Sequence, residues 1–462
     1  MSDTRPFALA PRARAQEPDV GRTATVYIET YGCQMNVYDT QVILARLQAA
    51  GFAPVDDHLA ADVVLVNTCS VREHAEHRVI SRLGELRRLR KQARRPPAVL
   101  GICGCMAERL REALTRQKFR VDFVVGVDRY DELPDLATTM LRSRSESTPP
   151  AVAVGHDQTV HYVAPPELYP ANNSHLVTIH KGCDYRCTYC IVPYTRGPQS
   201  EKPPAVILDE IAGVIARGGR EVTLLGQNVT AYHWRRELDF AGLLEQILAV
   251  GGLARIRFLT GHPHDMHPQL MDLIGREPRI CPWLHVPAQS GSDRILHRMK
   301  RRYTRADYLA MVDYARRAIP DVTFSSDFIV GFPGETEDDF AQTLDLLRTV
   351  RFDSVFTFKY SPRPGAPAAK LPDDVPLAEK QRRLAVLQEA QAAIWATLAA
   401  AAVGQTWPAV AEAPARRPRG HWRLRTAGNR KIVAPLLEAA PGDEYRLLIT
   451  GWRHTTFVGE PV

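Results

Sequence analysis

The chain has 462 residues, 45% hydrophobic and 24% charged, with a formal net charge of +7. This length predicts two or three domains, each able to bury its own core. No run of eighteen apolar residues occurs, so we expect no membrane span. Residues 1–23 contain arginine and proline but no apolar core, which predicts a disordered tail and no signal peptide. The positive charge permits a polyanionic partner such as RNA, but an arginine-rich protein with solvated helix faces explains it equally well.

The eight cysteines are too few for a disulfide scaffold in a chain of this length. Clustered thiols are typical of metal binding in a reducing compartment, so the expected location is the cytoplasm.

The first segment, residues 24–140, alternates short apolar strands with helical patterns. This order predicts an α/β domain in which helices cover a parallel sheet. The expected strands are 25–30, 62–66, 98–102 and 123–126, and the expected helices are 39–50, 71–90 and 106–116.

One cysteine follows each of the first three strands: Cys33, Cys69 and Cys105. The carboxyl ends of parallel strands meet at one edge of a sheet, so these thiols are expected to come together as a metal site. The helix after each cysteine would present its positive end to an anionic cluster. Cys103 competes with Cys105 for the third place. It falls inside the strand, however, where a buried packing role is expected.

Residues 141–175 contain Ser, Pro, Ala and Asn with little periodicity and are predicted to be a linker. The second segment, 176–376, shows six strands separated by amphipathic helices. This pattern predicts an incomplete (β/α)6 barrel with its active site at the carboxyl ends of the strands. The expected strands begin near Leu176, Glu221, Arg255, Trp283, Val322 and Ser354.

Cys183, Cys187 and Cys190 follow the first barrel strand in a Cys-x3-Cys-x2-Cys arrangement. Three thiolates can hold three corners of a cubane iron–sulfur cluster and leave the fourth iron open to a small molecule. The alternative is a zinc knuckle with His180 as the fourth ligand.

Polar residues also follow later strands of the predicted barrel. A single polar residue of this kind could serve a turn, but their gathering at the same barrel end predicts a binding site. The candidate residues are Gln227, Asn228, Gln289, Ser290 and Asp327.

The third segment begins with a connecting helix, residues 377–402, and continues as a small β-rich module, 403–462. The module contains nine Arg or Lys and five Asp or Glu, a net charge of +4. Small basic β-barrels often bind nucleic acid, although a structural cap for the larger barrel is the alternative.

Several sequence motifs together resemble the radical S-adenosylmethionine (SAM) methylthiotransferase family, from about Val26 to Val458. The motifs are Tyr31-Gly-Cys-Gln-Met-Asn36, Asn67-Thr-Cys-Ser-Val-Arg-Glu73, Gly104-Cys-Met-Ala107, the stretch from Gly182 to Gly197, Leu225-Gly-Gln-Asn-Val229, Pro287-Ala-Gln-Ser-Gly291 and the stretch from Asp327 to Thr336.

This resemblance implies two [4Fe-4S] clusters. Cys183, Cys187 and Cys190, the predicted catalytic cysteines, would hold the cluster that binds S-adenosyl-L-methionine and generates a 5′-deoxyadenosyl radical. Cys33, Cys69 and Cys105 would hold an auxiliary cluster that supplies or presents sulfur. The five polar residues at the strand ends would contact the cofactor or substrate.

Gln34, Met35 and Asn36, together with the stretch Ser70-Val-Arg-Glu73, resemble the branch that acts on dimethylallyladenosine next to the tRNA anticodon. Related branches act on threonylcarbamoyladenosine in tRNA or on a ribosomal protein. A non-catalytic RNA-binding protein with metal sites is the alternative from another class. The resemblance further implies a TRAM-like RNA-binding domain at 403–462, a tRNA partner, an electron donor such as a flavodoxin or ferredoxin, and a sulfur donor.

Overall fold

The computed structural model describes residues 23–70, 73–92, 99–116, 119–143, 149–165 and 174–462. The tail predicted at 1–23 therefore lies almost entirely outside the described residues. The chain divides into two compact units. The first consists of the described part of residues 1–170 together with Lys181–Tyr185 and Ile191–Lys202. The second consists of the remaining segments, chiefly Pro203–Val462.

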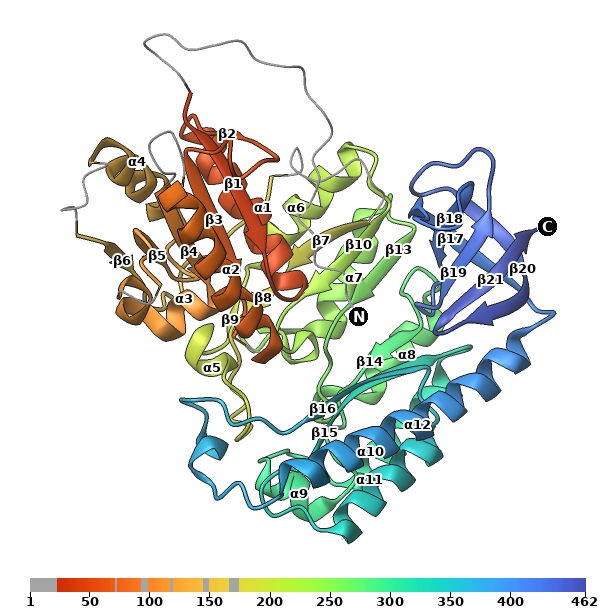
Figure 1. The fold of residues 1–462 in the computed structure, drawn as a ribbon. Coiled ribbons are helices and arrows are strands. Elements are labelled where there is room, and N and C mark those ends of the chain that lie inside the picture. The colour runs from red at the N-terminus through yellow and green to blue at the C-terminus, as the bar shows by residue number, and fades with distance from the viewer. Residues whose placement is uncertain (1–22, 71–72, 93–98, 117–118, 144–148, 166–173) are drawn as a thin grey trace. The chain divides into compact units, whose positions relative to one another are not determined.

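A six-stranded parallel sheet forms the centre of the first unit, in the order β2-β1-β3-β4-β5-β6 (Figure 1). Its strands are β1 (Thr25–Thr30), β2 (Ala53–Pro54), β3 (Val63–Thr68), β4 (Val99–Gly104), β5 (Phe123–Val125) and β6 (Ala151–Ala153). Its helices are α1 (Gln34–Ala49), α2 (Glu73–Gln92), α3 (Cys105–Leu110) and α4 (Leu133–Ser143).

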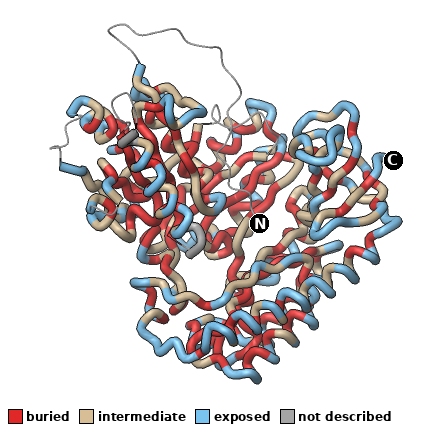
Figure 2. Tube along the Cα trace, viewed as in Figure 1, coloured by how far each residue is buried: buried red, intermediate tan, exposed pale blue. Residues whose placement is uncertain are grey.

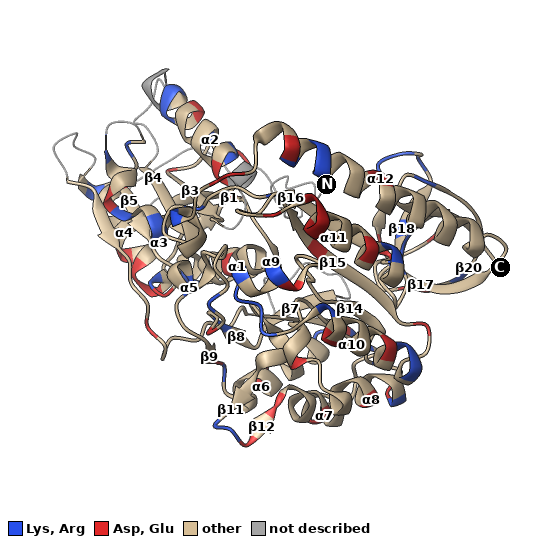
Figure 3. Ribbon diagram, turned by 90° about the horizontal axis from the view of Figure 1, so that it is seen from below, with Lys and Arg blue, Asp and Glu red and all other residues tan. Residues whose placement is uncertain are grey.

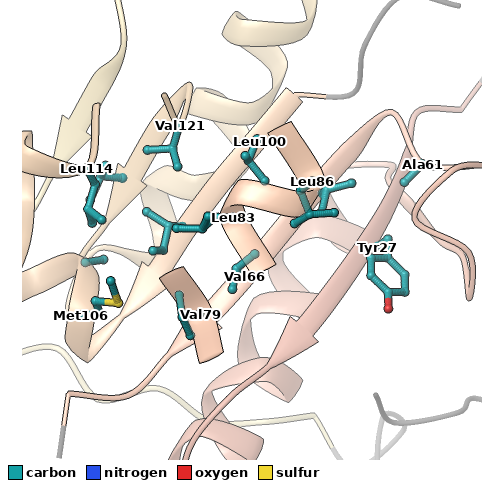
Figure 4. Packing of buried hydrophobic residues seen from close by; sticks show 14 residues of the cluster. Tyr27, Ala61, Val66, Val79, Leu83, Leu86, Leu100, Met106, Leu114 and Val121 are labelled. Carbon is teal, nitrogen blue, oxygen red and sulfur yellow. The ribbon is translucent and has the colours of Figure 1, made fainter. Parts of the chain in front are cut away.

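The amphipathic helix α2 packs on one face of this sheet (Figure 4). Val79, Leu83 and Leu86 of α2 lie in one buried cluster with Val66 of β3 and Leu100 of β4. The strands β3 and β4 are buried along their whole length. This explains why they appear in the sequence as continuous apolar runs, as expected for a sheet covered on both faces.

Two local features differ from the sequence pattern. Helix α1 begins at Gln34, five residues before the predicted start at Asp39, because Cys33 and Asn36 form a reciprocal capping arrangement that sequence periodicity does not reveal. The predicted linker contains β6, the edge strand of the sheet, which is too short to produce a periodic signal.

The second unit contains the six predicted barrel strands as two parallel three-stranded sheets. The first sheet has β7 (Ser174–Thr178), β10 (Glu221–Leu225) and β13 (Arg255–Phe258), and the second has β14 (Trp283–His285), β15 (Thr323–Val330) and β16 (Ser354–Lys359). The two sheets adjoin, because the Gly261 amide donates to the His285 carbonyl at 2.9 Å and Ile256 bridges to Ile280.

Helices follow the barrel strands in sequence, and their buried faces are apolar. Most residues of β15 are buried, whereas the residues of β16 are intermediate or exposed (Figure 2). The helices are α6 (Pro204–Ala216), α7 (Phe240–Val250), α8 (Pro268–Arg276), α9 (Asp293–Arg298), α10 (Arg305–Ala318) and α11 (Glu337–Val350). Shorter elements are β8 (His180–Lys181), α5 (Val192–Thr195), β9 (Ser200–Glu201), β11 (His233–Trp234) and β12 (Leu238–Asp239).

The predicted connecting helix is α12 (Leu377–Ala402), and it leads into a closed five-stranded barrel in the order β17-β18-β19-β21-β20. The barrel strands are β17 (Thr406–Pro414), β18 (His421–Arg425), β19 (Lys431–Pro435), β20 (Glu444–Arg453) and β21 (Thr456–Pro461). Within the described part of the chain, α12 is the one helix whose length and composition would allow a membrane span. Its end instead contributes Ala399 and Ala402 to the core of the small barrel. The predicted α/β fold class, with a parallel-sheet domain, an incomplete barrel and a small C-terminal β-barrel, is confirmed.

Candidate functional site

Cys33, Cys69 and Cys105 follow the carboxyl ends of three neighbouring parallel strands, β1, β3 and β4. The register aligns the ends of these strands, with Thr30 opposite Asn67 and Thr68 opposite Gly104. Cys69 and Cys105 are the first residues beyond β3 and β4, and Cys33 caps helix α1. The three cysteines are therefore placed at one edge of the sheet, as the spacing predicted.

A buried network of hydrogen bonds holds the three cysteine-bearing loops together. The Asn36 amide donates to the Thr68 carbonyl at 2.9 Å, and the Asn67 amide donates to the Asn36 carbonyl at 2.9 Å. The Thr68 hydroxyl donates to the Cys103 carbonyl at 2.6 Å. Because Asn36, Asn67 and Thr68 are fully buried, these bonds determine the loop positions without competition from water.

Glycine is required where the loops approach most closely. Gly104 has φ +89°, and a Cβ there would lie 2.5 Å from Oδ1 of Asn67. A Cβ at Gly32 would lie 2.8 Å from the Cβ of Cys69, so the Cys33 loop runs against Cys69. Larger residues at either position would push the cysteine loops apart.

Cys103 lies inside β4 and is fully buried, with its thiol 3.8 Å from the Val66 carbonyl. Burial raises the pKa of this thiol, with a smaller contribution from the charge of Asp39. These surroundings are those of a packing residue inside a strand, which is the role the sequence pattern predicted for it.

Arg196 reaches this group of cysteines, although the sequence did not assign it a role. Its Nε donates to the Cys105 sulfur at 3.2 Å, and its Nη2 donates to Asp39 at 2.6 Å. Burial raises the pKa of the Cys105 thiol, and the positive charge of Arg196 opposes that rise. The Tyr130 hydroxyl is also buried and has no hydrogen-bond partner among the described atoms. The only sequence signal for Arg196 was its place in the motif from Gly182 to Gly197.

Cys183, Cys187 and Cys190 lie in the loop between β8 and α5. Within the first unit, the Cys183 amide donates to the Gly197 carbonyl at 3.2 Å. Within the second unit, the amide of Cys190 donates to the carbonyl of Cys187 at 3.1 Å. Both parts of the loop are therefore held by backbone hydrogen bonds.

Arg301 is a second arginine that sequence reasoning missed. Its Nη1 donates to the sulfur of Cys187 at 3.5 Å, and its Nη2 donates to the Pro287 carbonyl at 2.9 Å. It thereby connects the cysteine loop to the loop after β14, where Gln289 and Ser290 lie. His180, the fourth ligand in the zinc alternative, has its Nε2 2.8 Å from the Asn228 carbonyl oxygen.

The five polar residues predicted to contact cofactor or substrate have different surroundings. The Asn228 amide donates to Asp265 at 2.6 Å, and the Ser290 hydroxyl lies 3.3 Å from that of Thr343. The side-chain oxygen of Gln227 is buried and has no partner among the described atoms. Gln289 has φ +67°, and its main chain pairs with that of β15. Asp327 lies 3.7 Å from His285, measured from Oδ1 to Nε2.

Aromatic side chains accompany Asp327 on one face of the β14-β15-β16 sheet. No sequence motif assigned a role to His285 or Phe356, although strand alternation places both on the Asp327 face. Their rings meet edge to face at 6.1 Å, and Phe356 is 48% exposed. The opposite face is buried, as Phe324 and Phe328 show. This less buried face combines an exposed ring with a carboxylate and an imidazole.

Among the described residues, no three His, Cys, Asp or Glu side chains converge as ligands of a single metal ion. A cubane cluster does not require its thiolate ligands to converge on one ion, because each thiolate attaches to a separate iron corner. Both groups of three cysteines offer the required donor atoms, and each has an arginine on one sulfur. The donor chemistry of each group therefore suits an iron–sulfur cluster.

Two family models match this chain, one over the parallel-sheet domain and one over the barrel strands. Residues 25–126 match a family described as uncharacterized protein family UPF0004, and residues 177–347 match the radical SAM superfamily. A tRNA-2-methylthio-N(6)-dimethylallyladenosine synthase from Chloroherpeton thalassium is 41% identical over 97% of this chain and 98% of its own length. The synthase of the same name from Chromobacterium violaceum is 42% identical, over 88% of this chain and 91% of its own.

Among solved structures, the radical S-adenosylmethionine methyltransferase TsrM from Kitasatospora setae matches with a TM-score of 0.55 and 16% identity, over 75% of each chain. This likeness concerns the fold alone. The identities of about 40% over nearly the full length show that the chain belongs to the radical SAM family of tRNA-2-methylthio-N6-dimethylallyladenosine synthases.

Proposed function

We propose that this protein methylthiolates C2 of N6-dimethylallyladenosine next to the tRNA anticodon, giving 2-methylthio-N6-dimethylallyladenosine. The observation that carries the proposal is the presence of two separate groups of three cysteines in one chain. One follows three adjacent strands of the first unit, and the other follows the first strand of a radical SAM barrel. Sulfur insertion by a radical enzyme requires both a radical source and a sulfur source, and two clusters could supply them.

The radical SAM family implies a [4Fe-4S] cluster and S-adenosyl-L-methionine. In this proposal Cys183, Cys187 and Cys190 hold that cluster, and Cys33, Cys69 and Cys105 hold a second one. When bound, the first cluster supplies the electron that cleaves the cofactor into a radical able to remove hydrogen from a carbon without acidity. The second cluster would supply or present the sulfur, and a second S-adenosyl-L-methionine would supply the methyl group.

The strand-end residues then have distinct roles. The buried Gln227 side-chain oxygen would accept a hydrogen bond from the cofactor or substrate, because a buried acceptor without a partner is costly. Asn228 and Ser290 would shape the loops that line the site, since their side chains already bond within the protein. Gln289 would present its amide from a strained main chain.

The face that carries Asp327, His285 and Phe356 would receive the adenine of the substrate. An exposed aromatic ring can stack on a base, and such stacking contributes about 1–3 kcal/mol per base. Asp327 could accept a hydrogen bond from a base edge, as carboxylates do in base recognition. Neither interaction requires the protein to read the surrounding sequence.

The C-terminal barrel would bind the tRNA as a TRAM-like domain. Lys and Arg residues occur in and near its strands, as around β18 in Figure 3, and its net charge of +4 suits a phosphate backbone. An electron donor such as a flavodoxin or ferredoxin, and a sulfur donor, would complete the reaction in the cytoplasm.

Nucleoside mass spectrometry of tRNA from cells that lack this protein tests the proposed substrate. We expect the methylthio group to disappear while the dimethylallyl group is retained, and the normal profile to return with the intact gene. A variant with Cys105→Ser should fail to restore it, whereas Cys103→Ser, changed two residues away, should succeed. An unchanged tRNA profile with an unmodified ribosomal protein would instead favour the ribosomal-protein alternative.

Iron analysis tests the proposed cofactors. Anaerobic reconstitution should give about eight irons per chain, because two four-iron clusters are proposed. Two tightly bound zinc ions and no iron would favour a non-catalytic RNA-binding protein.

A further inference from the structure

A buried arginine from a distant segment contacts the cysteine group of the first unit. Arg196 follows helix α5, lies 91 residues from Cys105 in the sequence and is 6% exposed. Its Nε donates to the Cys105 sulfur at 3.2 Å, and its Nη2 donates to Asp39 at 2.6 Å. All three residues belong to the same unit. The positive charge is therefore held between a thiol and a carboxylate, away from water.

The other cysteine group has an arginine in a similar position. In the second unit, Nη1 of Arg301 donates to Cys187 at 3.5 Å. Arg301 has no carboxylate among its hydrogen-bond partners in the described chain; its other partners are the Pro287 carbonyl and the Tyr303 hydroxyl. In both groups a guanidinium donates to one cysteine sulfur. Among the described residues, however, the guanidinium of Arg196 also pairs with a carboxylate, that of Asp39, whereas the guanidinium of Arg301 does not.

We propose that Arg196 is a positioning residue that sets the reduction potential of the cluster held by Cys33, Cys69 and Cys105. The inference rests on the second cluster of the proposed function. Reduction adds negative charge to a cluster, so a buried cation that donates to a ligand sulfur stabilises the reduced form and raises the potential. Asp39 acts in the opposite direction by partly neutralising that cation. The pair Arg196–Asp39 therefore adjusts this cluster separately from the one near Arg301.

The test measures the potential of each cluster by itself. A full-length chain with Cys183, Cys187 and Cys190 changed to alanine should retain only the first-unit cluster after anaerobic reconstitution. In that chain, a redox titration followed by electron paramagnetic resonance should show a more negative midpoint for Arg196→Gln. Arg196→Lys, which retains the charge, should restore most of the original value. Asp39→Asn should shift the midpoint the other way, to a less negative value.

The matched control uses the reciprocal chain, in which Cys33, Cys69 and Cys105 are changed to alanine. There Arg301→Gln should lower the midpoint of the remaining cluster, whereas Arg196→Gln should leave it unchanged. Equal shifts of both clusters by Arg196→Gln would indicate a general loss of structure and overturn the inference.

The outcomes separate this inference from the proposed function. If the chain without Cys183, Cys187 and Cys190 binds about four irons and neither Arg196→Gln nor Arg196→Lys changes its midpoint, the inference is wrong and the proposed function stands. If that chain binds no iron, there is no second cluster, and both the inference and the proposed function fail.

Discussion

Individual side chains that join distant segments form the surroundings of both cysteine groups. Arg196 contacts Cys105 across 91 residues, and Arg301 contacts Cys187 across 114 residues. Between the strand ends, Asn36 and Asn67 exchange hydrogen bonds that leave almost no room for a change of backbone. At this scale, the structure predicts which substitutions disturb the cysteine groups and which only disturb the fold.

Gly104→Ala should destabilise the first unit by more than the cost of placing alanine at this backbone angle, because the new Cβ also collides with Asn67. A left-handed backbone costs a non-glycine residue roughly 1–2 kcal/mol. The collision with Asn67 should add about 1–3 kcal/mol, as overpacking does. Gly51→Ala is a matched control, because Gly51 also has φ +89° but has no atom within 4 Å of its added Cβ.

The measurement for these two variants is thermal unfolding together with iron content after reconstitution. Both should unfold at lower temperature than the parent, but only Gly104→Ala should bind less iron. Equal effects on stability would show that the approach of Asn67 to Gly104 is unimportant.

Phe356→Ala should abolish recognition of the target base without abolishing RNA binding. Loss of stacking costs about 1–3 kcal/mol, or roughly 5- to 150-fold in affinity. The measurement compares anticodon stem-loops that carry either dimethylallyladenosine or an abasic site at the target position. The parent should prefer the base, Phe356→Ala should not, and Phe356→Tyr should regain the preference. A preference that survives in Phe356→Ala would place the base elsewhere.

At the scale of elements, one buried carboxylate joins the large barrel to the small one. Glu221 begins β10 and pairs with Arg255 and Arg257 of β13, at 2.7 and 3.0 Å, and with Arg425 of β18, at 3.3 Å. Arg257 also donates to the carbonyls of Thr426 and Ala427. The amino ends of the barrel strands, opposite the proposed active-site end, therefore hold the C-terminal barrel by charged hydrogen bonds.

Glu221→Gln should destabilise the second unit by about 3–5 kcal/mol, because it leaves the buried guanidinium of Arg257 without a countercharge. The exposed pair Arg276–Glu245 provides the control, since Glu245→Gln should change stability by less than about 1 kcal/mol. Chemical unfolding of the two variants gives the comparison. Similar values for both would mean that the Glu221 cluster contributes little.

The same carboxylate predicts a dependence on pH. Burial by itself raises the pKa of Glu221, but Arg257, Arg425 and Arg255 together lower it from 4.5 to about 2. Because the folded pKa is the lower one, the stabilisation is complete above pH 4.5 and is lost as the pH falls toward 2. Glu221→Gln should lack this part of the acid sensitivity when unfolding is followed across that range.

At the scale of the whole molecule, the net charge of +7 does not by itself show which surface binds RNA. Exposed arginines occur both on the small barrel and on the outer helices of the large one. If the small barrel binds tRNA, only its arginines should affect affinity. Changing Arg423, Arg446 and Arg453 to serine should weaken tRNA binding and lower the salt dependence by up to about 0.9 per lost phosphate contact.

The charge-matched control changes Arg276, Arg317 and Arg348, which are exposed on α8, α10 and α11. Fluorescence titrations at several salt concentrations should show an unchanged slope for that triple variant. Equal losses in both triple variants would mean that net charge, and not the barrel surface, determines the binding.

Much of the architecture could be predicted from local patterns. Alternating strands and helices predicted the parallel sheet and the six barrel strands, and the position of a cysteine after each of three strands predicted their common edge. The predicted strand end also distinguished Cys103, which lies inside the strand, from Cys105, which follows it. These inferences succeed because strand direction and periodicity are local properties, and parallel topology then places the strand ends together.

The tertiary structure decided what surrounds those residues. It placed Arg196 on Cys105 and Phe356 beside His285, and it directed Asn228 and Ser290 into internal hydrogen bonds. None of these contacts follows from spacing, because each depends on how loops distant in sequence pack after the strands have formed. The sequence by itself determined where the cysteines would lie, and the packing of distant loops decided which charges act on them.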